Sequence, residues 1–149
     1  MSELSARPIQ PDSSVTVLSV SAISEDHTTL RGLLRGLPCR LVVASTCRNA
    51  LRCLSHDPTC IIICERDLPD GTWRDVLNHL GASATKPFLI VTSPVADEAL
   101  WAEVLNLGGF DVIAKPFDQR EVRHVLETAC LRRPKLAAVA VGSTGAFAA

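Results

Sequence analysis

Three charged residues stand at the end of a long apolar run. The run occupies residues 60–64, contains three isoleucines, and is followed directly by Glu65, Arg66 and Asp67. A short β-branched run of this kind is typical of a strand that is buried on both faces of a parallel sheet. In open sheets flanked by helices, ligands and chemistry collect at the carboxyl ends of the strands. We therefore expect Glu65 to lie in a functional site.

Two further polar side chains end apolar runs in the same way. Thr92 ends the run at residues 87–92, and Lys115 follows the run at residues 111–114. The carboxyl ends of parallel strands meet at one edge of a sheet, so Glu65, Thr92 and Lys115 should face one pocket. A lysine buried at a strand end needs a carboxylate, because an unpaired buried charge costs about 3–5 kcal/mol. Glu65 is the expected partner of Lys115.

The alternation of patterns along the chain predicts an α/β fold. The expected strands are residues 15–21, 40–44, 60–64, 87–92 and 111–114, and the expected helices start at Ser24, Ser45, Thr72, Asp97 and Asp118. This order implies a doubly wound, five-stranded parallel sheet with strand order 2-1-3-4-5, as in a flavodoxin-like three-layer sandwich. We expect one domain at residues 15–133, between a disordered N-terminal segment (1–14) and a flexible C-terminal tail (134–149).

The composition is that of an ordinary globular domain, with 149 residues, 47% hydrophobic and 21% charged. A net charge of -1 gives no electrostatic reason to expect nucleic acid or a membrane surface as a partner. No apolar run approaches the ~18 residues of a membrane span, and no signal-peptide core is present, so we expect a cytoplasmic protein. The six cysteines include no Cys-x-x-Cys pair, which predicts thiols in the core rather than a metal site.

Three short segments together resemble the receiver domain of bacterial two-component response regulators (CheY-like). They are Leu68-Pro69-Asp70-Gly71, Val91-Thr92-Ser93 and Ala114-Lys115-Pro116-Phe117, and the resemblance covers about residues 15–133. In that family an aspartate three residues before Leu-Pro accepts a phosphoryl group from a sensor histidine kinase, with Mg²⁺ assisting. The Thr or Ser and the Lys contact the phosphoryl oxygens, and the Lys-Pro peptide is usually cis. The resemblance therefore implies a pocket formed by Thr92, Lys115 and Pro116, with Asp67 beside it.

Two of the family's usual residues are replaced. Glu65 stands where the family has the phosphoaccepting aspartate, and Val112 stands where it usually has Tyr or Phe. Glutamate is a poorer acceptor, because its carboxylate is one methylene further out. That carboxylate could instead reach Lys115 directly and imitate an already charged site. Val112 has no ring that could rotate to report whether the pocket is occupied.

The acidic pair that holds Mg²⁺ in the family is also altered. An ungapped count places the pair at Ala22 and Ile23, and we favour this register because Ser24 is a natural helix N-cap. A shorter first helix would bring Glu25 and Asp26 into the pair's place instead. In the favoured register Mg²⁺ would have too few hard oxygen ligands, since only Glu65, the backbone carbonyl of Asp67 and water remain. We therefore expect no firm metal site, with Glu25 and Asp26 as weak candidates.

The resemblance implies a stand-alone, atypical receiver that acts in phosphorelay signal transduction through protein–protein contacts and is not an enzyme. Its partner would be a sensor histidine kinase or another signalling protein, and it would be a monomer or a weak homodimer. The residues expected on its docking face are Trp101, Val112, Arg120 and Arg123. The alternative is a pseudo-receiver that is never phosphorylated and is locked in one state by Glu65. A remote third reading, a flavodoxin-like nucleotide- or flavin-binding protein, lacks a glycine-rich phosphate-binding motif.

Simpler structural roles are open for some of these residues. Glu65 could cap the strand end or pair with Arg66 or Arg120 at the surface, and Thr92 could simply end its strand. The expected contact between Glu65 and Lys115 could be a structural ion pair. Trp101 could be half-buried against Leu105 without docking a partner. The four histidines lie in polar helical contexts, and we assign none of them a catalytic role.

Overall fold

The computed structural model describes residues 15–56, 58–81 and 86–132. The main sheet contains the strands β1 (Val15–Val20), β2 (Cys39–Ala44), β3 (Ile61–Glu65), β6 (Phe88–Ser93) and β7 (Asp111–Ala114). The helices are α1 (Ser24–Leu33), α2 (Cys47–His56), α3 (Trp73–Leu80), α4 (Glu98–Leu107) and α5 (Gln119–Arg132). Two short strands, β4 (Asp67–Leu68) and β5 (Gly71–Thr72), form a separate antiparallel hairpin that the sequence analysis did not predict.

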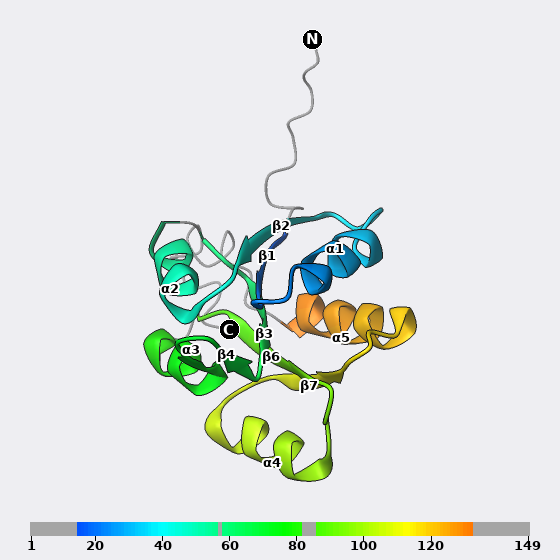
Figure 1. The fold of residues 1–149 in the computed structure, drawn as a ribbon. Coiled ribbons are helices and arrows are strands. Elements are labelled where there is room, and N and C mark those ends of the chain that lie inside the picture. Colours follow the sequence, from blue (N-terminus) through cyan, green and yellow to red (C-terminus); the bar gives the residue numbers. More distant parts are fainter. Residues whose placement is uncertain (1–14, 57, 82–85, 133–149) are drawn as a thin grey trace, which may run out of the picture.

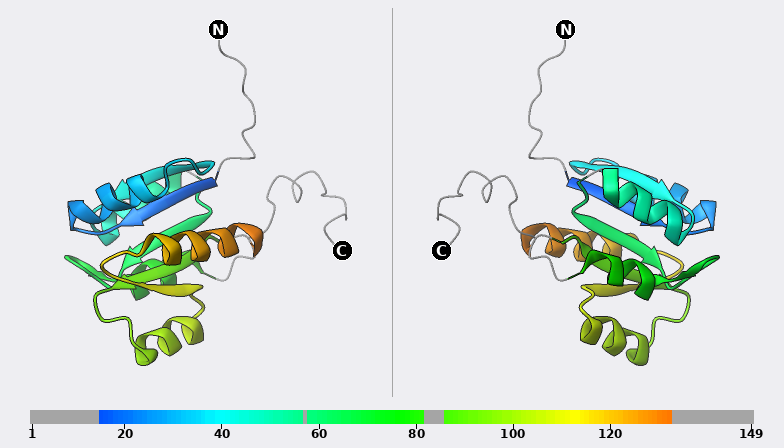
Figure 2. Two further views of the ribbon diagram at one scale, coloured as in Figure 1. Left: turned by 90° about the vertical axis from the view of Figure 1, so that its right-hand side faces the viewer. Right: turned by 90° about the vertical axis from the view of Figure 1, so that its left-hand side faces the viewer.

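The main sheet confirms the predicted topology. Its strands lie in the order β2-β1-β3-β6-β7, and every neighbouring pair is parallel. Since β6 and β7 are the fourth and fifth strands of this sheet along the chain, this is the order 2-1-3-4-5. The helices α1 and α5 cover one face, and α2, α3 and α4 cover the other, which gives the three layers of a doubly wound fold (Figures 1 and 2).

The central strands are buried on both faces, as their apolar runs predict. On β3, Ile61 and Ile63 pack in the cluster below α1 and α5, whereas Ile62 and Cys64 pack in the cluster below α2, α3 and α4. All four side chains are at most 2% exposed. The alternation follows from the period of two along a strand, and it explains why no polar residue interrupts the run. Trp73, which is fully buried, is the largest side chain in the second cluster.

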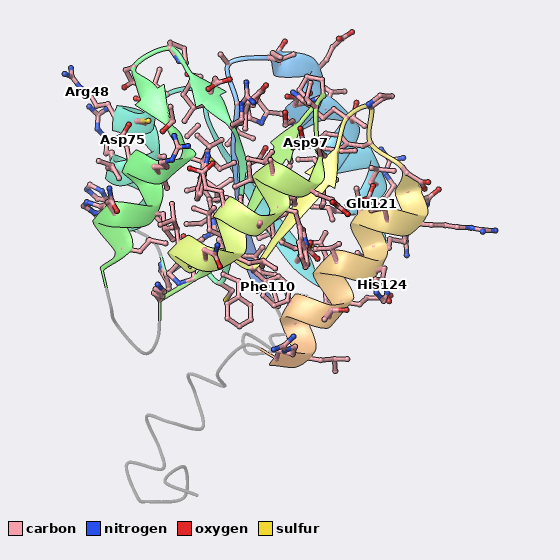
Figure 3. The ribbon with its side chains drawn as sticks, turned by 90° about the horizontal axis from the view of Figure 1, so that it is seen from below. Arg48, Asp75, Asp97, Phe110, Glu121 and His124 are labelled. Atoms are coloured by element: carbon pink, nitrogen blue, oxygen red, sulfur yellow. The ribbon has the colours of Figure 1, made fainter. Side chains whose placement is uncertain are left out.

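Two helices begin as the sequence predicts. Thr72 caps α3 in a capping box with Asp75, and the Asp97 side chain caps α4 by accepting from the backbone N–H of Leu100. Figure 3 shows Asp97 at the same end of the molecule as Asp75, with Phe110 nearer the opposite end. The helix α4 therefore starts at the carboxyl edge of the sheet.

Two predicted caps are wrong. The N-cap of α1 is Ile23, with no side-chain cap, and Ser24 is already helical. Ser21 organises this turn instead, because its hydroxyl accepts from the backbone N–H of Ile23. At α2 the hydroxyl of Thr46, one residue after Ser45, accepts from the backbone of the third helical residue.

The cysteines agree only in part with the expectation of thiols in the core, because Cys47 and Cys64 are buried and the other four are half-buried. All six cysteines fall within the described ranges, and none of them forms a disulfide. Among the described residues, no helix is long and apolar enough to cross a membrane. The segments predicted as a disordered N-terminus (1–14) and a flexible tail (134–149) lie outside the described residues.

The C-terminus of α4 supports a stability prediction. Gly108 has a φ of +106° in the left-handed region, where a side chain is disfavoured. We expect Gly108→Ala to lower the free energy of unfolding by about 1–2 kcal/mol. In the matched control Gly32→Ala, the added methyl group meets nothing within 4 Å in α1, and alanine should stabilise that helix by up to about 1 kcal/mol. Urea unfolding of both variants measures this, and a Gly108→Ala protein as stable as the parent would contradict it.

Candidate functional site

The carboxyl edge of the sheet carries a compact network of four polar side chains. The ammonium nitrogen Nζ of Lys115 lies 2.9 Å from Oε1 of Glu65 and 2.8 Å from Oδ2 of Asp26. The hydroxyl of Ser21 lies 2.7 Å from the same Asp26 oxygen and 3.0 Å from the same Glu65 oxygen. One cation is thus shared between two carboxylates, and one hydroxyl lies between them.

The network is largely shielded from water. The side chains of Lys115, Asp26 and Glu65 are 10%, 13% and 14% exposed, and Ser21 is buried. Burial alone would lower the pKa of Lys115, but its hydrogen bonds and attraction to Asp26 and Glu65 outweigh that effect and raise it. Lys115 is therefore held in its charged form. With both carboxylates ionised, the three charged groups sum to -1.

The contact that the sequence analysis predicts between Glu65 and Lys115 is present. Glu65 therefore does not pair with Arg66 or Arg120, and Arg66 instead pairs with Asp67 at the surface. The Asp67 side chain is 65% exposed and pairs with Arg66 in the hairpin after β3. The pocket role expected for this residue rests on its backbone carbonyl and stays a prediction.

Thr92 and Pro116 lie next to the network. Thr92 is buried and stands opposite Glu65 in the register of β3 and β6, so the two side chains lie on the same side of the sheet. Pro116 is exposed and follows Lys115 through a cis peptide bond, as the resemblance implied. The roles predicted for both residues stay predictions.

The favoured register places the acidic pair at Ala22 and Ile23 and leaves Asp26 outside the site, which is wrong. Ala22 and Ile23 are exposed, and it is Asp26, in the first turn of α1, that enters the site. Glu25 is exposed because successive helical side chains are about 100° apart around the axis. The site thus receives one acid from α1 rather than an adjacent pair.

A histidine and a serine hold the first turn of α1 in place. His27 Nε2 is 2.9 Å from the carbonyl oxygen of Ser21, and its Nδ1 is 2.8 Å from the hydroxyl of Ser19. A carbonyl can only accept, so Nε2 donates to Ser21, and in the neutral imidazole Nδ1 then accepts from the Ser19 hydroxyl. This bridge ties α1 to β1 and thereby positions Asp26. The sequence analysis missed both Ser21 and His27, since only the tertiary contact reveals them.

The residues present do not fit a magnesium site. The Asp26 and Glu65 oxygens that face each other already accept from the Lys115 ammonium group. Among the described residues, no group of three or more His, Cys, Asp or Glu side chains could hold a metal ion. Mg²⁺ needs several oxygen ligands in octahedral geometry, which two lysine-bound carboxylates do not offer.

Only some residues of the predicted docking face are exposed. Trp101 on α4 is 50% exposed, Leu105 is 36% exposed, and Arg120 lies at the surface. The prediction for Val112 is wrong, because it is 8% exposed and packs in the core with α4. The prediction for Arg123 is also wrong. Its guanidinium Nη2 donates to the backbone carbonyl of Arg35, at 3.4 Å, on the side of α1.

Asp70 links the hairpin that follows β3 to the N-terminus of α2, a contact that the sequence does not reveal. Its carboxylate accepts from the backbone N–H of Cys47, at 2.7 Å, and of Arg48, at 3.0 Å. It thus caps the N-terminus of α2 from the hairpin that follows β3. These two hydrogen bonds lower the pKa of the carboxyl group. Locally, Asp70-Gly71 has only the pattern of a turn.

No family model matches the chain. Over 116 residues the chain is 34% identical to the transcriptional regulatory protein KdpE of Mycobacterium tuberculosis H37Rv, a match that covers 76% of this chain and 51% of KdpE. The chain therefore spans about half the length of the curated relatives that it matches.

Solved receiver domains share the fold of this chain. The signal receiver domain of an HD domain-containing protein from Pseudomonas fluorescens Pf-5 has a TM-score of 0.71 at 24% identity, over 78% of this chain and 94% of that one. That of a putative LuxO repressor protein from Vibrio parahaemolyticus has a TM-score of 0.74 at 18% identity, over 80% and 92%. The chemotaxis response regulator CheY4 of Vibrio cholerae has a TM-score of 0.70 at 15% identity, over 78% and 98%. The predicted CheY-like fold is confirmed.

The shared cation predicts strong coupling between Glu65 and Lys115. Lys115→Met leaves two carboxylates without a cation, whereas Glu65→Gln leaves Lys115 paired with Asp26. We therefore expect Lys115→Met to be the more destabilising change, by less than the about 3–5 kcal/mol of a fully buried pair. In a double-mutant cycle by urea unfolding, the double variant should lose less stability than the sum of the single losses. Additive losses would show that the two side chains do not interact.

The Asp70 cap predicts a dependence of stability on pH. Because the pKa of folded Asp70 is lowered from 3.8, its contribution is present above that value and is lost as the pH falls through the lower pKa of the folded state. We expect Asp70→Asn to lose less stability than the parent between about pH 5 and pH 2. The control is Asp67→Asn, which removes an exposed carboxylate of the same hairpin. Equal acid sensitivity of the parent and Asp70→Asn, measured by thermal unfolding, would refute the prediction.

Proposed function

We propose that this chain is a receiver domain of two-component signalling whose site is held in one charged state by its own side chains. It passes its signal through protein–protein contacts, as the pseudo-receiver reading of the sequence suggests. The observation that carries this proposal is the pair of contacts from Lys115 Nζ to Glu65 and Asp26, at 2.9 and 2.8 Å. The lysine that would contact phosphoryl oxygens is already occupied by carboxylates.

Glu65 is a partial substitute for a phosphoryl group. A phosphoryl group brings about -1.5 to -2 charges and three strong acceptor oxygens, whereas a glutamate brings one charge and two oxygens. The Glu65 carboxylate contacts the Lys115 ammonium group directly, at 2.9 Å. A side chain shifts a conformational equilibrium only by its different interaction with the two states. We therefore infer a biased equilibrium rather than a fully activated domain.

The charge of the network also opposes phosphorylation. Transfer of a phosphoryl group requires cations or donors that stabilise the negative charge spreading over its oxygens. Here the only cation within the network is Lys115, and it is already outnumbered by two carboxylates. A phosphoryl group at Glu65 would have to compete with Asp26 for that ammonium group.

The second candidate is a receiver that is phosphorylated in the ordinary way. The observation that favours it is the position of Asp26, which supplies an acid at the site where the favoured sequence register had none. In either case we propose a cytoplasmic module whose partner is a sensor histidine kinase or another signalling protein. The exposed Trp101 and Arg120 are the residues of the predicted docking face that a partner could contact.

Exposure to acetyl phosphate with Mg²⁺ separates the two candidates. We expect the parent protein to gain no adduct of about 80 Da in its intact mass, because Lys115 is engaged and the site carries excess negative charge. The comparison protein is Glu65→Asp, which shortens the side chain by one methylene and should weaken its contact with Lys115. A stable adduct on Glu65 of the parent protein would overturn the proposal in favour of the second candidate.

The same proposal has a conformational control. In Glu65→Ala the network loses one carboxylate, and backbone amide shifts should change across residues 97–123, with altered affinity for any purified partner kinase. Asp67→Ala removes a nearby acid that lies outside the network. If Glu65→Ala leaves both readouts unchanged, Glu65 does not set the signalling state.

A further inference from the structure

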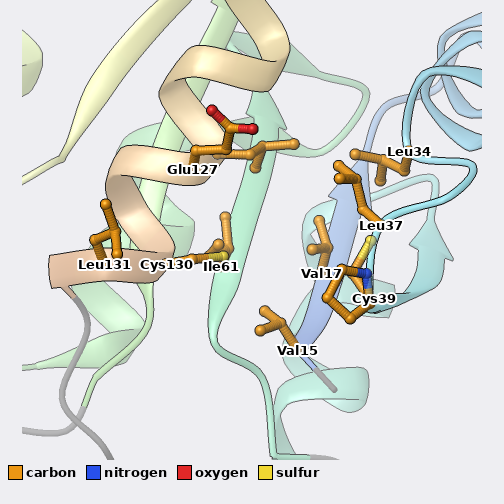
Figure 4. Close-up of a pocket in the computed structure, with 11 residues that line it drawn as sticks. Val15, Val17, Leu34, Leu37, Cys39, Ile61, Glu127, Cys130 and Leu131 are labelled. Atoms are coloured by element: carbon orange, nitrogen blue, oxygen red, sulfur yellow. The ribbon is translucent and has the colours of Figure 1, made fainter. Parts of the chain in front are cut away.

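The amino edge of the sheet, opposite the charged network, carries an apolar groove of about 420 Å³. Figure 4 shows Leu131 and Cys130 of α5 on one side, Leu37 on the other, and Val15 and Ile61 between them. Val15 and Ile61 are the first residues of β1 and β3, so the groove lies at the far end of the strands from Glu65.

The groove presents apolar surface at the end of the last described helix. Leu131, which lines it, is 83% exposed, and Cys39 on the opposite wall is half-buried. Apolar surface gains about 25 cal/mol for each Å² that is removed from water. Covering the groove with an apolar segment would therefore make a favourable contribution, against the entropy lost on ordering that segment.

We propose that residues 136–141 of this chain occupy the groove. They read Leu-Ala-Ala-Val-Ala-Val, six apolar residues without a charge, and they lie outside the described part of the chain. They follow α5 after only three intervening residues, 133–135. An extended chain spans at most about 3.3–3.6 Å per residue, so residue 136 stays within about 14 Å of Arg132, the helical residue next to Leu131.

Charge and shape support the same occupant. Of the described residues that line the groove, Glu127 is the one that carries a charge. Lys135 stands directly before the apolar segment and would bring a complementary charge to that carboxylate. Alanine and valine side chains are small enough to lie between two facing walls. The N-terminal segment, residues 1–14, also adjoins Val15, but it contains charged residues and two prolines and lacks such an apolar run.

Cys39 offers a reporter for this contact in the full-length chain. We would measure its rate of alkylation by peptide mass mapping in the variant Leu136→Asp/Val139→Asp. The matched control, Ala146→Asp/Ala149→Asp, adds the same charges outside the apolar segment. Cys53 of α2 packs beside the other core cluster, away from the groove, and serves as the internal standard.

We expect Cys39 to react several-fold faster in Leu136→Asp/Val139→Asp than in the parent or the control, with Cys53 unchanged. Equal Cys39 rates in all three proteins would overturn the proposal. Protection that grows with protein concentration would also overturn it, since a second copy would then cover the groove. A stability measurement on each variant identifies any general unfolding, which would accelerate Cys53 as well.

Discussion

The site depends on one ammonium group that serves two carboxylates. Lys115 comes from the end of β7, Glu65 from the end of β3, and Asp26 from the first turn of α1, so three separate parts of the chain converge on one charge. Isolated, each of these groups would be costly to remove from water. Together they are stable only while the strands keep their parallel register and α1 keeps its start. The fold and the charge network therefore support each other.

The loops at this edge are joined by side chains that bridge distant segments. His27 and Ser21 hold α1 on β1, and Asp70 holds the hairpin after β3 on the N-terminus of α2. Each bridge pairs a side chain with backbone groups that a loop or a helix end leaves without a partner. The edge is thus stiffened around the network by His27 and Asp70, which are not members of it.

The sequence predicts those parts of this site that depend on local pattern. The apolar run before Glu65 and the register of the strands follow from burial on both faces, and these place Glu65 near Lys115. Asp26 could not be placed, because the start of α1 is set by a contact with Ser21 rather than by Ser24. Asp70 could not be assigned either, since the amide groups that it caps are more than 20 residues away. Which side of a helix faces a neighbour, as for Arg123, likewise depends on tertiary packing.

The single proton of the Ser21 hydroxyl has a further consequence. That oxygen accepts from the Ile23 amide and lies within hydrogen-bond distance of both carboxylates, yet it can donate to only one of them at a time. Any event that neutralises or removes one carboxylate would fix the direction of this proton and change the support of the first turn of α1. The first turn of α1 would then respond to the charge of the pocket, on the face of the sheet that α1 and α5 cover and away from α4.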